Sequence, residues 1–164
     1  MFTPALAGQS TGPRSIATFN AGVIAAHPEN IVTLVEPLAG LGDEREFLVF
    51  QTVPGPLYWW QSTRDRGLAL CCLDPFAAGL DPDMVIEPAH AQAIDAEGVD
   101  DIIVHTLVVL EQDPTQTRTN LRAPILIGRR SNKALQVILD DPRLPVKGYI
   151  MELVARAQKA KTSC

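Results

Sequence analysis

The three histidines, His27, His90 and His105, are the side chains of this sequence best suited to proton transfer or metal binding. They are widely spaced, and none stands in a His-Glu-x-x-His, phosphate-binding or dinucleotide-binding pattern. A Gly-x-Ser-x-Gly nucleophile motif is absent as well. We therefore expect satisfied core or surface histidines, and we predict no catalytic residue, no metal site and no cofactor.

The cysteines are the candidate nucleophiles and zinc ligands, and they stand at Cys71, Cys72 and Cys164. No Cys-x-x-Cys pair is present, which argues against a zinc site. Cys71 and Cys72 lie in an apolar run without a neighbouring cation that would lower a thiol pKa. We expect them to be structural, on opposite faces of one strand. The odd cysteine count and the lack of a signal-peptide pattern predict a cytoplasmic protein.

Two charged clusters are further candidates for binding. The acidic cluster consists of Asp74, Asp81 and Asp83. It lacks the spacing of a calcium-binding EF-hand loop, and turn-forming Asp-Pro pairs account for it. The basic cluster consists of Arg129, Arg130 and Lys133. It is either a solvated turn or a contact for an acidic partner.

The adjacent pair Trp59-Trp60 is the clearest indication of binding in the residues themselves. Successive strand residues face opposite sides, so one tryptophan should point inward and the other outward. Tryptophan is favoured in the most energetically important parts of protein interfaces. The outward residue therefore indicates a binding module, unless it packs under the C-terminal helix, and both interpretations remain open.

The elements that must position these residues are mostly short strands. Apolar runs of four to ten residues alternate with turn residues, which is typical of consecutive antiparallel strands. The expected strands are 15–20, 31–35, 44–53, 57–63, 68–73, 101–110, 115–121, 124–127 and 134–139. After the strand at 68–73, Asp74 should cap a turn, and Phe76 should either plug the barrel mouth or lie on the surface.

Two helices interrupt the strands. One is expected at 88–97, between Pro88 and Gly98, and the other at 148–161, where an apolar stripe recurs at helical spacing. We predict a mainly β protein, a small antiparallel β-barrel-like fold with one short internal helix and a C-terminal helix. Its expected parts are a disordered tail (1–13), the barrel domain (14–147) and the amphipathic C-terminal helix with its tail (148–164).

Composition excludes several classes of protein. The chain has 164 residues, 46% of them hydrophobic and 20% charged, which fits one globular domain and excludes wholesale disorder. The net charge of −5 argues against nucleic acid or an anionic membrane surface as the partner. The apolar run 68–73 is far shorter than the roughly 20 residues of a membrane span.

Two blocks of the sequence resemble the FliW family of flagellar assembly factors. The first is Leu-Tyr-Trp-Trp-Gln-Ser at 57–62, followed by the apolar run that ends in Asp-Pro-Phe at 74–76. The second is Asn-Leu-Arg-Ala-Pro-Ile at 120–125, followed by Gln-Val-Ile-Leu at 136–139. The resemblance covers residues 14–146. It is weak in the turn 37–42 and at the N-terminal strand, and residues 148–164 extend beyond the family's usual end.

The resemblance implies a non-enzymatic, monomeric flagellar assembly factor of the bacterial cytoplasm. Such a protein binds flagellin and antagonises the RNA-binding translational repressor CsrA, and thereby couples flagellin synthesis to export. The candidate partner-binding residues are Trp59, Trp60, Asp74 and Phe76. An acidic chain suits a basic, RNA-binding partner, because complementary charge speeds and orients docking.

Two other functions remain as alternatives. One is a small-ligand-binding or enzymatic β-barrel of unknown substrate, which would need polar residues converging on an interior pocket of about 300 Å3 or more. The other is a nucleic-acid-binding barrel, against which the acidic balance speaks.

Overall fold

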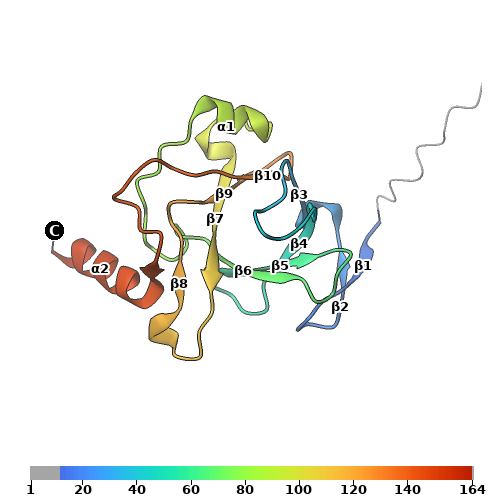
Figure 1. The fold of residues 1–164 in the computed structure, drawn as a ribbon, viewed down its shortest axis with the longest axis horizontal. Helices are drawn as coiled ribbons and strands as arrows, with labels where there is room; N and C mark the ends of the chain where they lie inside the picture. The colour runs from blue at the N-terminus through green and yellow to red at the C-terminus, as the bar shows by residue number, and fades with distance from the viewer. Residues whose placement is uncertain (1–11, 164) are drawn as a thin grey trace, which may run out of the picture.

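The centre of the molecule is a closed barrel of seven strands (Figure 1). The computed structural model describes residues 12–163. In their order around the barrel, the strands are β3 (Ile31–Leu34), β4 (Glu46–Phe50), β5 (Leu57–Ser62), β6 (Ala69–Leu73), β7 (Ile102–Val109), β9 (Ile125–Gly128) and β10 (Lys133–Gln136). Closure comes from β7 pairing with β9 and from β10 pairing with β3. The mainly β fold expected from the sequence is thus confirmed.

One strand pair departs from the antiparallel expectation. β10 runs parallel to β3, with Lys133 opposite Thr33 and Ala134 opposite Leu34, whereas the other barrel pairs are antiparallel. A parallel pair needs a long connection between its strands, and here it joins the first and last barrel strands in the sequence. Together with β7–β9, this pair closes the barrel, so its seven strands form a continuous ring.

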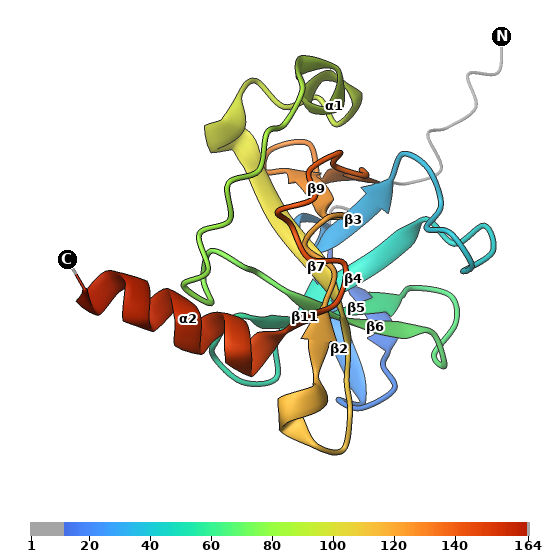
Figure 2. The same cartoon turned by 60° about the vertical axis from the view of Figure 1, so that its left-hand side comes forward.

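Smaller elements surround the barrel (Figures 1 and 2). β1 (Arg14–Ala17) and β2 (Val23–Ala26) form a separate hairpin, and β8 (Arg118–Thr119) and β11 (Gly148–Tyr149) extend the sheet from the end of β7. The helices are α1 (Pro88–Ala93) and α2 (Ile150–Thr162), and three 3-10 turns are η1 (Pro28–Asn30), η2 (Val99–Asp101) and η3 (Pro114–Gln116). No described helix is both long and apolar enough to cross a membrane.

Alternation along the strands separates the buried side chains into distinct cores. Side chains that point into the barrel form the first core, with Phe47, Trp60 and Cys72 among them. A second core lies outside the barrel, where Val104 and Leu126 pack against residues of the long connections and of α1 and α2. The hairpin β1–β2 covers a third, around Leu48 on the outer face of β4. The barrel interior is therefore filled by side chains.

Both helices are shorter than the sequence predicted. α1 ends at Ala93 and not at residue 97, because Asp95 takes a left-handed conformation with φ of 53°. The amide of Ala96 then donates to the carbonyl of Ala91 at 2.8 Å, which closes the helix before Gly98 is reached. α2 begins at Ile150 and not at residue 148, because the two preceding residues pair with β8 as strand β11.

The sequence predicted one strand too long and did not predict another. The predicted strand at 115–121 is reduced to β8, because Asp113 accepts a hydrogen bond from the Thr115 amide and starts the 3-10 turn η3. β2 had not been predicted, since its sequence Val-Ile-Ala-Ala alternates poorly. The tail expected at 1–13 lies outside the described residues except for Gly12 and Pro13.

Candidate protein-binding surface

The two adjacent tryptophans lie on opposite faces of β5, as alternation predicted. Trp60 is fully buried in the barrel core, 5.9 Å from Phe47 between ring centroids. Its indole Nε1 donates a hydrogen bond to Nδ1 of His105 at 3.0 Å. Trp60 therefore serves the fold, and because its side chain is fully buried it offers no surface to a partner, contrary to its expected role in partner binding.

His105 is the buried acceptor of that bond, and Tyr58 packs against its ring with centroids 4.5 Å apart. Burial lowers the pKa of His105 to about 4, against a smaller opposing influence from Asp74. The imidazole is consequently neutral near pH 7, and its Nδ1 accepts the indole proton. It is a satisfied core histidine, as the sequence led us to expect.

Trp59 lies on the outer face and lines an open apolar groove of about 340 Å3. The remaining lining comes from β6, β7 and the residue after β7, namely Ala69, Leu70, Cys71, Leu107, Val108, Val109 and Leu110. We call this the Trp59 groove. Val109 and Leu110 are about half exposed, at 48% and 50%. The groove therefore offers apolar surface to solvent beside a half-buried aromatic ring.

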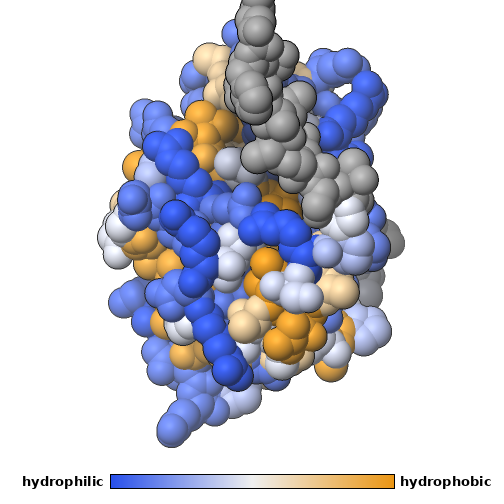
Figure 3. All heavy atoms as spheres, turned by 90° about the vertical axis from the view of Figure 1, so that its right-hand side faces the viewer, coloured by the Kyte–Doolittle hydropathy of each residue, from blue (hydrophilic) through white to orange (hydrophobic). Residues whose placement is uncertain are grey.

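Phe19, from the turn of the β1–β2 hairpin, partly covers Trp59. The two rings meet edge to face, with centroids 4.7 Å apart, and Phe19 itself is 42% exposed. No residue of α2 lines the Trp59 groove, so the idea that the C-terminal helix covers Trp59 was wrong. Figure 3 shows the hairpin side of the molecule, where hydrophobic residues gather among hydrophilic ones. The hairpin thus continues the apolar surface beyond the groove.

The motif residues after Trp60 hold this surface in place. The side-chain oxygen of Gln61 accepts a hydrogen bond from the Phe19 amide at 2.9 Å, which ties the hairpin turn to β5. Its Nε2 donates to the carbonyl of Asp65 at 3.0 Å, which holds the β5–β6 turn. Ser62 Oγ accepts from the Asp65 amide at 2.9 Å. Gln61 and Ser62 therefore support Phe19 and Trp59 and are not themselves exposed for binding.

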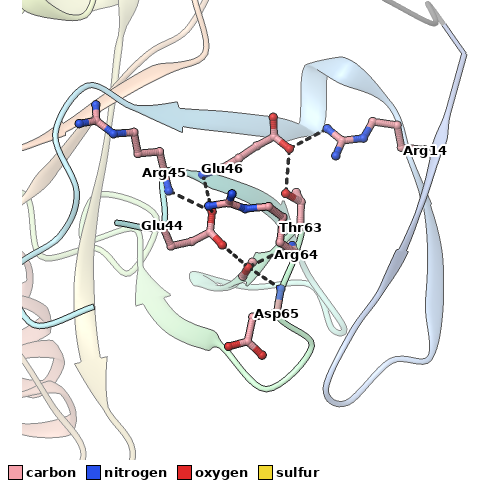
Figure 4. Close-up of polar contacts among 8 residues, drawn as sticks. Arg14, Glu44, Arg45, Glu46, Thr63, Arg64 and Asp65 are labelled. Carbon is pink, nitrogen blue, oxygen red and sulfur yellow. Dashed lines mark hydrogen bonds and ion pairs between the residues drawn. The ribbon is translucent and has the colours of Figure 1, made fainter. Parts of the chain in front are cut away.

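A buried carboxylate completes this support (Figure 4). Glu44 accepts hydrogen bonds from Ser62 Oγ at 2.6 Å and from the amides of Arg45 and Glu46 at 3.0 and 3.1 Å. Burial alone would raise the pKa of Glu44, but these hydrogen bonds and the nearby Arg64 guanidinium hold it below its ordinary value. Glu44 is thus a charged structural group that fixes the start of β4 against the β5–β6 turn.

Asp74 and Phe76 lie at the end of β6. Asp74 Oδ1 accepts hydrogen bonds from the amides of Phe76 and Ala77, both at 3.0 Å, so it caps the turn as predicted. Phe76 is 45% exposed, which places its ring on the surface and not in the barrel mouth. Of the four residues predicted to bind a partner, Trp59 and Phe76 are therefore the aromatic side chains that solvent reaches.

The other candidates for chemistry have structural surroundings. Burial raises the pKa of the Cys71 thiol to about 11 and that of Cys72 well above its ordinary value, so neither is an activated nucleophile. Cys164 lies outside the described residues. Within residues 12–163, no group of three or more His, Cys, Asp or Glu side chains is placed to hold a metal ion.

The two charged clusters are neutralised in part by ion pairs. Arg130 pairs with Glu97 at 3.0 Å and with Asp101 at 3.8 Å, and Lys133 pairs with Asp95. Two of the three basic residues are thus paired with acids, and Arg129 donates to the backbone carbonyl of Asp100 at 3.4 Å. Asp83 lies 3.6 Å from the Arg143 guanidinium.

The sequence did not reveal the rest of the surface. No sequence motif singles out Phe19, Val109 and Leu110, although all three are exposed next to Trp59 or its groove. For Val109 and Leu110 the signal was available, since an apolar strand end followed by charged residues is a place where apolar side chains reach solvent. Phe19 reaches Trp59 through tertiary packing, for which no local pattern exists.

Comparison with known proteins gives one consistent result. A family model described as "FliW protein" matches residues 15–150. Proteins named flagellar assembly factor FliW are similar over most of their length. The one from Caldicellulosiruptor saccharolyticus is 29% identical over 131 residues, 80% of this chain and 86% of that protein. The one from Ruminiclostridium cellulolyticum is 30% identical over 139 residues, 84% and 94% of the two chains.

A solved structure supports the fold. The crystal structure of a flagellar assembly factor FliW superposes with a TM-score of 0.75 at 23% identity, and the match covers 84% of this chain and 96% of that one. The family match ends at residue 150, so nearly all of α2 lies beyond it.

Proposed function

Because this chain belongs to the FliW family of flagellar assembly factors, we propose that it binds flagellin and antagonises the translational repressor CsrA. Flagellin would capture the protein and leave CsrA free to repress flagellin translation. Export of flagellin would release the protein, which then binds CsrA and relieves the repression. The match over residues 15–150 is the observation that carries this proposal.

The Trp59 groove is the surface we assign to partner binding. It combines an aromatic side chain with half-exposed aliphatic residues, which is the composition of an interface centre. Phe19 extends it on one side, and Phe76 adds a further exposed ring after β6. Gln61 holds Phe19 through a hydrogen bond, so the surface is preorganised before a partner arrives.

The remaining parts of the proposal follow from the same family. The protein acts in the cytoplasm as a monomer, without catalysis and without a cofactor. The net charge of −5 suits CsrA, which as an RNA-binding protein carries basic surface. A ligand-binding or enzymatic barrel has less support, because Trp60, Phe47 and their neighbours fill the barrel interior.

Calorimetric titration of the full chain with purified flagellin, and separately with CsrA from the same organism, tests this proposal. We expect 1:1 binding of flagellin, and we expect flagellin to reduce the binding of CsrA when both are present. If neither partner binds at high micromolar concentration and low salt, the proposed function is wrong for this chain.

A further inference from the structure

The charges of this chain are unevenly distributed along the sequence. Residues 67–117 contain no Lys or Arg, and their acidic residues are Asp74, Asp81, Asp83, Glu87, Asp95, Glu97, Asp100, Asp101, Glu111 and Asp113. Basic side chains from later in the chain pair with some of these acids, for example Arg118 with Glu111 at 2.9 Å. The acids that stay unpaired mark where the molecule presents negative charge.

Two extended segments run along the flank of the barrel that carries α1 and α2, opposite the β1–β2 hairpin (Figure 1). One precedes α1 and contains Val85, and the other follows β10 and contains Ile138. In the first segment, Met84 and Ile86 pack against the second core, while Val85 between them is 70% exposed. In the second, Val137 and Leu139 are buried in the same core, while Ile138 is 82% exposed. Each segment therefore buries alternate residues and turns a β-branched side chain to solvent.

A groove of about 280 Å3 lies between these segments. Its lining consists of Val85, Glu87, His90, Ile138, Leu139, Asp140, Asp141 and Leu144. We call it the flank groove. Glu87 and Asp140 have no ion-pair or hydrogen-bond partner for their carboxylates among the described residues. The flank groove thus combines two exposed aliphatic side chains with two uncompensated negative charges.

The backbone beside the flank groove is also unpaired. Val137 and Leu139 donate their amides to the carbonyls of Pro124 and Arg122, at 3.0 and 2.8 Å. These hydrogen bonds pair one edge of the segment, and the amide of Ile138 points to the other edge. The backbone of Ile138 and of residues 83–86 forms no hydrogen bond within the described chain. Extended backbone with free amides and carbonyls is a template for an added extended strand.

We propose that the flank groove binds an extended segment of a protein partner in which Lys or Arg residues stand next to aliphatic residues. The aliphatic side chains of that segment would contact Val85 and Ile138. Its cations would pair with Glu87 and Asp140, and its backbone would pair with the free backbone groups of this flank. Charge complementarity favours a basic segment, because the unpaired carboxylates of Glu87 and Asp140 would repel an acidic one.

This inference goes beyond the proposed function. The flank groove and the Trp59 groove share no lining residue, so one molecule would have two separate docking surfaces. The flank groove would then be available while the Trp59 groove is occupied. Its test does not use flagellin or CsrA, so its failure and the failure of the proposed function are distinguishable.

Selection of a random heptapeptide display library on the full chain tests the proposal. Counter-selection uses the double variant Glu87→Lys/Asp140→Lys, in which the groove charge is reversed. We expect peptides that bind the unmodified chain but not this variant to contain Lys or Arg beside Val, Ile or Leu. The selected peptide is then synthesised with a fluorophore and titrated by anisotropy. Its affinity should fall at least tenfold with the double variant and also with Ile138→Asp.

The matched control is Glu36→Lys/Asp43→Lys, which changes the net charge by the same amount. Both of these acids are exposed and have no side-chain partner among the described residues. Affinity should change less than twofold in this control, and thermal melting of all variants should match that of the unmodified chain. The proposal is overturned if the selected peptides lack basic residues, or if the control variant weakens binding as much as the groove variant.

Discussion

The inner and outer faces of β5 differ in what their aromatic residues do. On the inner face, Trp60 is fully buried and its only polar atom is bonded to His105. On the outer face, Trp59 borders an open groove and touches the half-exposed Phe19. Two neighbouring residues of the same type thus have different surroundings: Trp60 stabilises the core, and Trp59 borders the surface that we propose for binding. The motif at 57–62 that resembles the FliW family contains both tryptophans, and its polar residues Gln61 and Ser62 hold turns.

The largest loss of stability is expected on the inner face of β5, at Trp60. Trp60→Ala removes a fully buried ring and leaves His105 Nδ1 without its donor. We expect a loss of about 3–5 kcal/mol in the free energy of unfolding, measured by urea denaturation. A loss below about 1 kcal/mol would mean that the inner face is not the closed core described above.

Removal of the buried carboxylate should have the next largest effect. Glu44→Ala leaves Ser62 Oγ and two backbone amides without their acceptor. We expect a loss of about 1–3 kcal/mol in unfolding free energy. Glu36→Ala, at an exposed acid, is the control and should change stability by less than about 0.5 kcal/mol. Equal effects in the two variants would show that the Glu44 network contributes nothing to the support of the Trp59 groove.

Acidification should weaken the inner face through His105. Its pKa in the folded protein is about 4, below the ordinary value of 6.5. Between these two pH values His105 is therefore protonated in the unfolded chain but neutral in the folded one. The stabilisation is complete above pH 6.5 and is lost as pH falls from 6.5 toward 4. Between pH 7 and 5 we expect a loss of about 2 kcal/mol.

His105→Gln is the control for this pH dependence, because Gln keeps an acceptor for the Trp60 indole but does not titrate. The low pKa values of Glu44 and Glu46 act only at lower pH, as the pH falls through the usual carboxyl range near 4.5. If the variant shows the same slope between pH 7 and 5, the titrating group is not His105.

The sequence predicts the alternation of the two faces of β5 better than it predicts which distant segments pack against them. Alternation correctly predicted that one tryptophan of the pair faces inward and the other outward, although it did not say which, and the Asp-Pro-Phe segment correctly predicted the cap by Asp74. Closure of the barrel through the parallel pair β3–β10 has no local signal, because it joins residues about a hundred positions apart. The contact of Phe19 with Trp59 likewise depends on where the hairpin packs.

Errors in the sequence prediction have local physical reasons. The end of α1 is set by Asp95 in a left-handed conformation, a position at which glycine was the expected residue. The basic cluster looked free because its acidic partners, Asp95, Glu97 and Asp101, stand some thirty residues earlier in the sequence. Such pairings become visible only in the folded chain.

The outer face should show the smallest effect on stability and the clearest effect on binding. Trp59→Ala removes a half-buried ring from the groove, so the free energy of unfolding should fall by much less than in Trp60→Ala. Val99→Ala, at an aliphatic residue 70% exposed outside the Trp59 groove, is the matched surface control.

Calorimetric titration of flagellin into the unmodified chain, Trp59→Ala and Val99→Ala tests the central claim most directly. We expect Trp59→Ala to remain folded and to bind at least about tenfold more weakly, a loss of about 1.4 kcal/mol, while Val99→Ala binds as the unmodified chain does. Equal affinity of all three proteins for flagellin would contradict the assignment of the Trp59 groove as the partner-binding surface.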